Sequence, residues 1–160
     1  MPRKSSERSL VKIDLDGSFD VAASPGQAYA FLTDPTRFAP LLPMFKELKD
    51  VGPDSFQIVL DVGMPQIRGR AEAQVCFIER IEGEHARFSS SVRHSLGMAD
   101  GGMGFTLSPL SGGSRIDWVC NTKVRGTLAS IASGLLAPLA RRNIAAMIAS
   151  VRAELDRVQP

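Results

Sequence analysis

The segment TLASIASGLLAPLARRNIAAMIASVRAELDR, residues 127–157, decides the fold of this 160-residue chain. Its apolar residues recur at steps of three and four, which is the pattern of one long amphipathic helix. They are Leu128, Ile131, Leu135 and Leu139 and, after a one-residue slip, Ile144, Met147, Ile148, Val151 and Leu155. Because proline lacks a backbone donor and clashes with the preceding turn, Pro138 predicts a kink or short break near Leu136 to Leu139. Such a helix needs a broad apolar surface to lie on.

The chain before this helix consists almost entirely of predicted strands. Residues 10–21 alternate strictly between apolar and polar side chains, which is typical of a half-buried strand. Further strand segments follow at residues 44–50, 55–62, 67–77, 86–94, 105–107 and 115–124. Tight turns between successive strands favour an antiparallel sheet, and helices segregated to one face of it make the fold class α+β.

Two short helices are predicted between the first and second strands. Ser24 stands three residues before Gln27 with a proline between them, which is a capping box with proline at the first helical position. This signal predicts a helix over 25–32. Asp34 and Pro35 repeat the start signal and predict a second helix over 35–41. Together the two helices would form a hinge or lid.

Composition indicates one ordinary globular domain. The chain is 44% hydrophobic and 22% charged, and we expect residues 10–158 to form a single domain after a frayed basic N-terminus, residues 1–9. The net charge is only +2, but residues 120–160 carry six basic residues against two acidic ones. This asymmetry would permit contact with an anionic membrane or an acidic partner, and a solvated helix face explains it equally well. It is too sparse for a nucleic-acid interface.

The cysteines and the apolar segments favour a cytoplasmic protein. Cys76 and Cys120 lie in separate predicted strands without a CxxC pair, so we expect reduced, buried thiols. The N-terminus lacks the apolar core of a secretory signal. The longest charge-free run, residues 126–140, is shorter than the roughly 20 residues of a membrane span.

No motif predicts a metal or a nucleotide cofactor. His, Cys, Asp and Glu show no metal-ligand spacing, and H-E-x-x-H is absent. The run GMADGGMG, residues 97–104, lacks the strand and helix context of a dinucleotide site and the lysine of a phosphate loop. We interpret it as a β-bulge or a set of sheet-bending glycines, and we expect no cofactor.

Three segments carry a resemblance to a known family: GSFDVAASPGQAYAFLTDPTRFAPLLP (17–43), SLGMADGGMGFTLSPL (95–110) and SRIDWVCNTKVRGTLASIASGLL (114–136). The chain resembles the START-like (SRPBCC) superfamily, and within it is most similar to the carbon monoxide dehydrogenase G-subunit family. The resemblance implies a helix-grip fold, in which a seven-stranded antiparallel sheet wraps around a long C-terminal helix and leaves an apolar cavity. Two features depart from the family: Pro43-Met44-Phe45 replaces a proline-glycine-cysteine-like step, and the chain ends at Pro160 without the tail that many members add for membrane attachment.

Small residues around Gly134 in the C-terminal helix cannot fill a wide concave sheet, so either the backbones approach closely there or a cavity remains for a ligand. On this hypothesis Gly134→Phe would abolish ligand binding. The candidate ligand-binding residues are Phe38, Leu41, Phe56, Ile58, Phe88, Val92, His94, Met103, Phe105, Trp118, Ile131, Leu135 and Met147. The alternative is that these side chains simply form the core.

Two functions from different classes remain open. The first is binding of a quinone- or lipid-like molecule, with an accessory role for a molybdenum-hydroxylase-type dehydrogenase and peripheral contact with the inner face of the membrane. The second is a polyketide cyclase/dehydratase-like enzyme, in which His94 acts as acid or base beside an inward carboxylate or tyrosine. Tyr29 is the only tyrosine and lies on the first short helix, so the sequence favours binding over catalysis. A structural histidine is the other interpretation of His94.

Overall fold

The computed structural model describes residues 10–64 and 66–157, and one antiparallel sheet dominates it. The elements in chain order are β1 (Leu10–Val21), α2 (Pro25–Leu32), α3 (Pro35–Phe38), the 3-10 helix η1 (Ala39–Leu41), β2 (Phe45–Lys49), β3 (Ser55–Gly63), β4 (Arg68–Ile81), β5 (His85–His94), β6 (Gly97–Leu110), β7 (Gly113–Arg125), α4 (Thr127–Ala132) and α5 (Leu136–Arg157). The predicted frayed segment, residues 1–9, and residue 158 lie outside the described residues.

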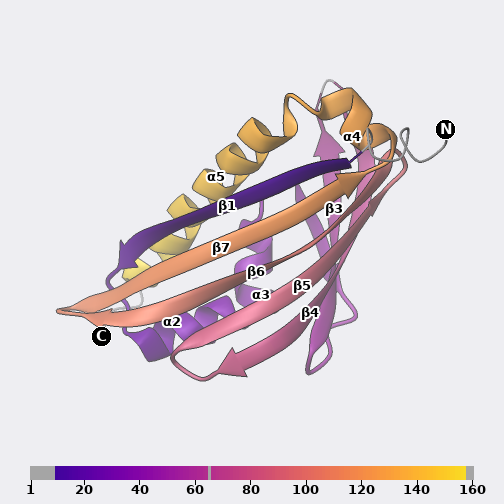
Figure 1. Cartoon of the computed structure of the whole chain (residues 1–160). Helices are drawn as coiled ribbons and strands as arrows, with labels where there is room; N and C mark the ends of the chain where they lie inside the picture. The colour runs from indigo at the N-terminus through magenta and orange to yellow at the C-terminus, as the bar shows by residue number, and fades with distance from the viewer. Residues whose placement is uncertain (1–9, 65, 158–160) are drawn as a thin grey trace.

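The seven strands follow the order β1-β7-β6-β5-β4-β3-β2, so β1 and β2 form the two edges. The sheet curves around α2 and α3, and α5 runs beside β1 along one edge (Figure 1). This arrangement confirms the predicted α+β class, the seven-stranded sheet and the long C-terminal helix.

The predicted start signals of the two short helices are confirmed. The side-chain oxygen of Ser24 accepts a hydrogen bond from the Gln27 backbone N–H at 3.2 Å, and Gln27 Oε1 accepts one from the Ser24 backbone N–H at 3.0 Å. Asp34 caps the second helix by accepting from Thr36 N–H at 3.0 Å. These caps satisfy backbone donors that the first helical turn leaves unpaired.

The C-terminal segment is two helices, and the predicted site of the break is wrong by a few residues. The chain leaves the helix at Ser133–Leu135, just before the predicted break. Pro138 lies in the first turn of α5, where its missing N–H forfeits no intrahelical bond. Ile131, in α4, and Leu135, in the turn, are 48% and 46% exposed.

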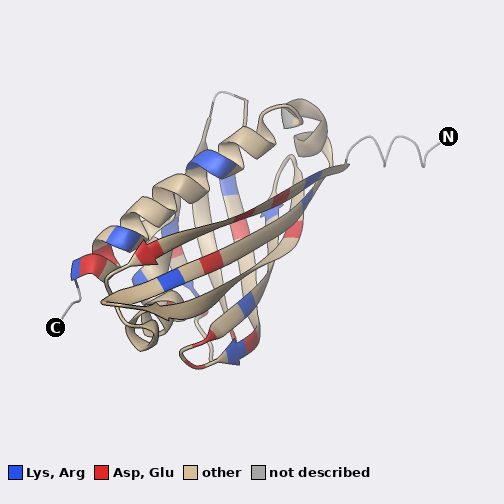
Figure 2. Cartoon of the chain, turned by 60° about the vertical axis from the view of Figure 1, so that its left-hand side comes forward, with Lys and Arg blue, Asp and Glu red and all other residues tan. Residues whose placement is uncertain are grey.

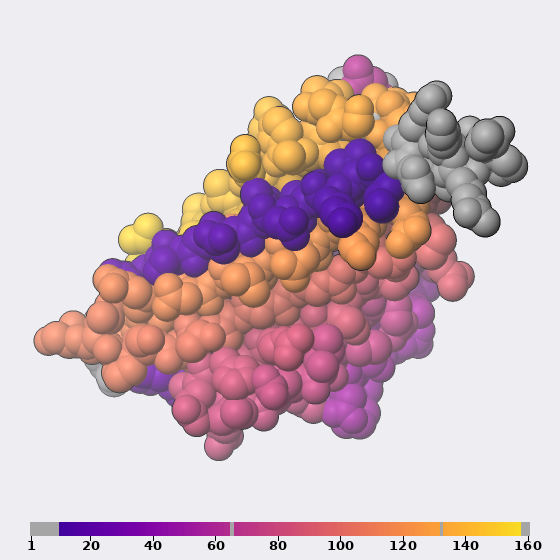
Figure 3. Space-filling view, in the orientation of Figure 1, coloured from indigo at the N-terminus to yellow at the C-terminus, as the bar shows by residue number. Residues whose placement is uncertain are grey.

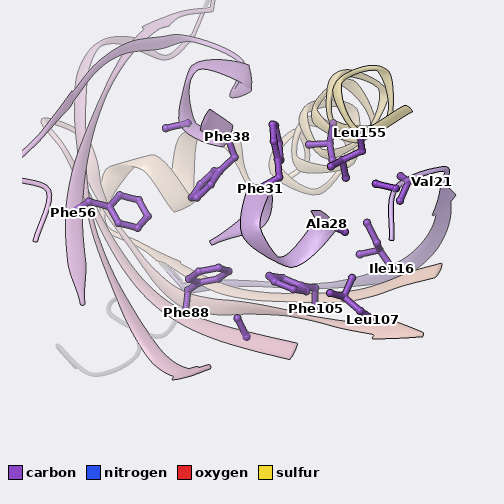
Figure 4. Close-up of a cluster of buried hydrophobic side chains, with 14 of the residues drawn as sticks. Val21, Ala28, Phe31, Phe38, Phe56, Phe88, Phe105, Leu107, Ile116 and Leu155 are labelled. Atoms are coloured by element: carbon purple, nitrogen blue, oxygen red, sulfur yellow. The ribbon is translucent and has the colours of Figure 1, made fainter. Parts of the chain in front are cut away.

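The buried side chains form two separate clusters. The main core joins the sheet to α2, α3 and the end of α5, and it includes Phe31, Phe56, Val151 and Leu155 (Figure 4). The second cluster consists of Ile13, Ile67, Val124, Ala129 and Leu136. Through the main core runs a chain of aromatic contacts with ring centroids 4.9 to 6.4 Å apart, in the order Phe38, Phe56, Phe77, Phe88, Phe105 and Tyr29.

The glycine run lies inside a regularly paired strand, so its interpretation as a β-bulge is wrong. β6 pairs residue by residue with both β5 and β7 across residues 97–104. A Cβ atom added to Gly101 would lie 1.9 Å from the backbone oxygen of Asn121. Close approach of the neighbouring backbone therefore requires glycine there.

Candidate functional site

An apolar cavity of about 110 Å³ lies between the sheet and the middle of α5. Its lining residues are Phe19, Leu32, Phe38, Phe88, Met103, Gly104, Phe105, Ile116, Trp118, Val119, Ile144, Met147, Ile148 and Val151. None of these described residues is titratable, and the indole Nε1–H of Trp118 is the one polar side-chain group among them. The site can therefore bind apolar groups but holds no acid, base or nucleophile.

Simple periodicities bring these residues together. In the sheet, alternation turns the same faces of β1, β5, β6 and β7 toward the helix, which places Phe19, Phe88 and Phe105 on the concave side. On α5, Ile144, Met147, Ile148 and Val151 stand at positions i, i+3, i+4 and i+7, so they share one face of the helix.

Six of the sequence-predicted residues line this cavity, whereas the remaining seven lie elsewhere. The six are Phe38, Phe88, Met103, Phe105, Trp118 and Met147. Leu41, Phe56, Ile58 and Val92 pack in or against the main core instead. Phe56 and Ile58 lie on β3, near the sheet edge opposite β1, whereas the cavity lies toward β1, β7 and α5.

The prediction that Ile131, Leu135 and Gly134 face the cavity is wrong. Ile131 and Leu135 are exposed, and a Cβ atom on Gly134 would meet nothing within 4 Å. Gly134 lies in the turn that separates α4 from α5, outside any helix face. Gly134→Phe is therefore not a test of the cavity.

Sequence reasoning missed Val119, which stands on the polar face of β7, and six further large apolar residues of the lining, although the signal of these six was present. The six are Phe19, Leu32, Ile116, Ile144, Ile148 and Val151. All six stand on the apolar positions of their predicted strand or helix. What the pattern could not show was the point along α5 at which the helix leaves space against the sheet.

His94 lies away from the cavity, at the end of β5, and both of its ring nitrogens are engaged. Nδ1 accepts a hydrogen bond from the Leu96 backbone N–H at 3.1 Å, so Nε2–H donates to the backbone oxygen of Arg68 at 2.8 Å. These contacts link the β5–β6 turn to the start of β4. The geometry is that of a structural histidine.

Replacing His94 with alanine is expected to lower the free energy of unfolding by about 1–2 kcal/mol, because two hydrogen bonds are lost and their partners are left to water. Ligand binding is expected to stay unchanged. Urea denaturation and a binding titration on the same sample measure both quantities. A variant that folds as stably as the wild type but loses binding would contradict this assignment.

Trp118 occupies a special position in the lining. It pairs in register with Gly17 of β1, and a Cβ atom on Gly17 would lie 2.7 to 2.9 Å from three atoms of the indole ring. The absence of a side chain at Gly17 thus makes room for the indole. Its Nε1 atom is buried and has no hydrogen-bond partner in the described part of the chain.

The two cysteines are free and half-buried, whereas the sequence predicts buried thiols. Burial raises the pKa of the Cys120 thiol above its ordinary value of 9.0. The thiolate, which is the reactive form, is correspondingly depleted at neutral pH.

We expect iodoacetamide at pH 8 to modify Cys120 several-fold more slowly in the folded protein than in 6 M guanidinium, where the thiol regains its ordinary pKa. Peptide mass spectrometry at timed intervals measures the rate. Equal rates in the two states would show that burial does not protect this thiol.

Residues 10–64 and 66–157 offer little support for a metal site or a membrane-spanning helix. No group of three or more potential metal ligands occurs within that part of the chain. None of its helices combines the length and hydropathy needed to cross a membrane.

Comparison with known protein families finds one that matches most of the chain. The sequence model of the carbon monoxide dehydrogenase G-subunit (CoxG) family matches residues 17–156. A search of curated proteins finds no match.

Solved structures show the same fold at low sequence identity. A conserved protein from Geobacillus kaustophilus superposes with a TM-score of 0.82 at 17% identity, covering 91% of this chain and 96% of that one. A START superfamily protein from Mycobacterium smegmatis gives 0.67 at 13% identity, covering 91% and 99%. The di-domain ARO/CYC StfQ from the steffimycin biosynthetic pathway gives 0.65 at 14% identity, covering 97% of this chain and 53% of that one.

Proposed function

The chain belongs to the CoxG family, and on this premise we propose that it binds a hydrophobic, quinone- or lipid-like molecule between the sheet and α5. The observation that carries the proposal is the cavity lining, which is apolar throughout and contains no titratable side chain. Pockets of this kind bind ligands by excluding water from apolar surface.

The size of the cavity limits how the ligand binds. Its 110 Å³ is well below the roughly 300–1,000 Å³ of typical ligand pockets. Either part of the ligand enters or α5 moves away from the sheet. Methionine in the wall suits such adaptation, because the thioether side chain is flexible and polarisable.

An accessory role for a molybdenum-hydroxylase-type dehydrogenase is part of the same proposal. The family description names carbon monoxide dehydrogenase, and that description supports a protein partner of this class. A tagged copy expressed in its own host should co-purify with such a dehydrogenase when the cells express one.

The exposed turn between α4 and α5 supports a peripheral membrane contact. Ile131 and Leu135 project there, and Arg141 and Arg142 follow on the next turns of chain. Apolar side chains beside basic ones favour the interface of an anionic bilayer. Co-sedimentation with vesicles of 30% phosphatidylserine tests the contact, and Leu135→Asp should reduce it.

The competing function is catalysis of the cyclase type. The similarity in fold to the ARO/CYC protein StfQ supports considering it. Such chemistry needs an acid or base in the cavity. The described lining offers none, and His94 is held elsewhere by two backbone groups. The geometry therefore supports binding better.

Native mass spectrometry of protein purified from its own host, followed by organic extraction, tests the proposed function. We expect a co-purifying apolar molecule that organic solvent releases. An empty protein that also fails to bind added decanol or menadione would overturn the proposal.

A further inference from the structure

A second hollow, of about 220 Å³, opens on the surface between β1 and α5. We call it the outer groove, and its residues are Leu15, Asp16, Trp118, Arg141, Ile144, Ala145 and Ile148. Figure 3 shows β1 and α5 side by side on this face of the molecule. The apolar cavity of 110 Å³ described above is called the inner cavity. Trp118, Ile144 and Ile148 also line it, so these three side chains separate the two hollows.

The helix side of this wall lies outside both core clusters. β1 is an edge strand, and Ile144 and Ile148 belong to neither core cluster. No residue from 137 to 150 is fully buried, whereas Leu136 packs in the second cluster and Val151 in the main core. At the far end, Asp156 Oδ1 accepts a hydrogen bond from the Ala22 backbone N–H at 2.9 Å. Helix α5 is thus buried most deeply at its two ends, and between them Ala140 packs against the second cluster and Met147 against the main core.

Resting on the proposed function, we infer that the ligand is an amphiphile with an anionic end, whose apolar chain passes between Trp118, Ile144 and Ile148 into the inner cavity and whose anionic end binds Arg141 in the outer groove. Neither hollow alone reaches the roughly 300 Å³ of a typical ligand pocket, but the two joined do. The inner cavity has no charged side chain in its lining, so the charged end stays outside.

Charge favours an anion on the helix side of the groove. Arg141 is exposed and forms no ion pair with any described residue. Helix α5 carries three basic side chains, Arg141, Arg142 and Arg152, before its first acidic residue, Glu154. Figure 2 marks basic residues along α5 and acidic ones on the neighbouring β1. Asp16 lies on the strand side of the groove and repels an anion, which directs the anionic end toward Arg141.

Trp118 adds an independent observation. Its buried Nε1–H has no partner among the residues described, and a buried donor without an acceptor is unfavourable. Because Trp118 lines the outer groove as well as the inner cavity, we expect a ligand oxygen bound in the groove to accept this hydrogen bond. A guanidinium and an indole N–H together suit a carboxylate.

Calorimetric titration with decanoate and 1-decanol, which share one chain and differ in charge, tests the inference. We expect the wild type to bind decanoate more tightly than decanol. Arg141→Glu should weaken decanoate about tenfold and leave decanol within twofold. Asp16→Asn should tighten decanoate. The control is Arg142→Glu, which changes the same charge on the neighbouring residue outside the groove and should change decanoate affinity less than threefold.

Equal losses in the Arg141 and Arg142 variants would overturn the anion site, because they would show a general effect of surface charge. If decanol binds as tightly as decanoate, the anion site is also overturned, although the proposal of hydrophobic binding stands. If the wild type binds neither probe, the cavity itself fails and the proposed function falls together with this inference.

Discussion

Replacing Leu155 with alanine is expected to lower the free energy of unfolding by about 3 kcal/mol, within the 2–5 kcal/mol of buried leucine truncations. Leu155 is fully buried in the main core, where the last turns of α5 meet the sheet and α2. Its removal leaves a cavity and releases the anchored end of the helix. Guanidinium denaturation followed by circular dichroism measures the change.

Leu135→Ala is the matched control, because it deletes the same atoms from a side chain that is 46% exposed. Its free energy of unfolding should change by less than about 0.5 kcal/mol. If the two variants lose similar stability, the C-terminal half of α5 is not the gripped segment that the structure describes.

Replacing Met147 with tryptophan is expected to reduce binding of an apolar ligand at least tenfold. Met147 lines the inner cavity on the face of α5 that meets the sheet, so a larger ring there occupies the space that the ligand needs. Overpacking should lower the free energy of unfolding by at most about 1–3 kcal/mol. Titration with decanol, together with a melting curve, separates lost binding from lost folding.

Met98→Trp makes the same exchange at a methionine that is 41% exposed and lies outside the cavity lining. Decanol binding should be preserved in this variant. Normal binding in Met147→Trp would show that the ligand site lies elsewhere.

Most of the fold could be predicted from periodicity, because alternation in strands and repeats in helices show which side of an element is buried. The strand over residues 10–21 and the capping box at Ser24 follow directly from local rules. The break at Ser133–Leu135 does not, because it depends on how the helix meets the edge of a curved sheet. Pro138 indicates a break nearby. Because proline is also tolerated in a first helical turn, it does not show whether the helix ends there or begins there.

The sequence predicted the kind of site, an apolar cavity, but not which residues line it. An apolar face on each strand shows which side chains point inward, yet it does not distinguish those that pack against α3 from those that face empty space. Phe56 and Phe88 have the same pattern, and only Phe88 lines the cavity. The distinction depends on sheet curvature and on the phase of α5, both of which are tertiary properties.

The pairing of β1 with β7 has a consequence for biosynthesis. Residues 10–21 find their partner strand only at residues 114–125, and the core is completed by Leu155. A ribosome adds about 5–20 residues per second, so the first strand leaves the exit tunnel seconds before its partner exists. During that interval its edge and its apolar face are unprotected. Chaperone dependence during translation is therefore expected, and folding from denaturant should be slow for a chain of this size, since such distant pairings raise the contact order.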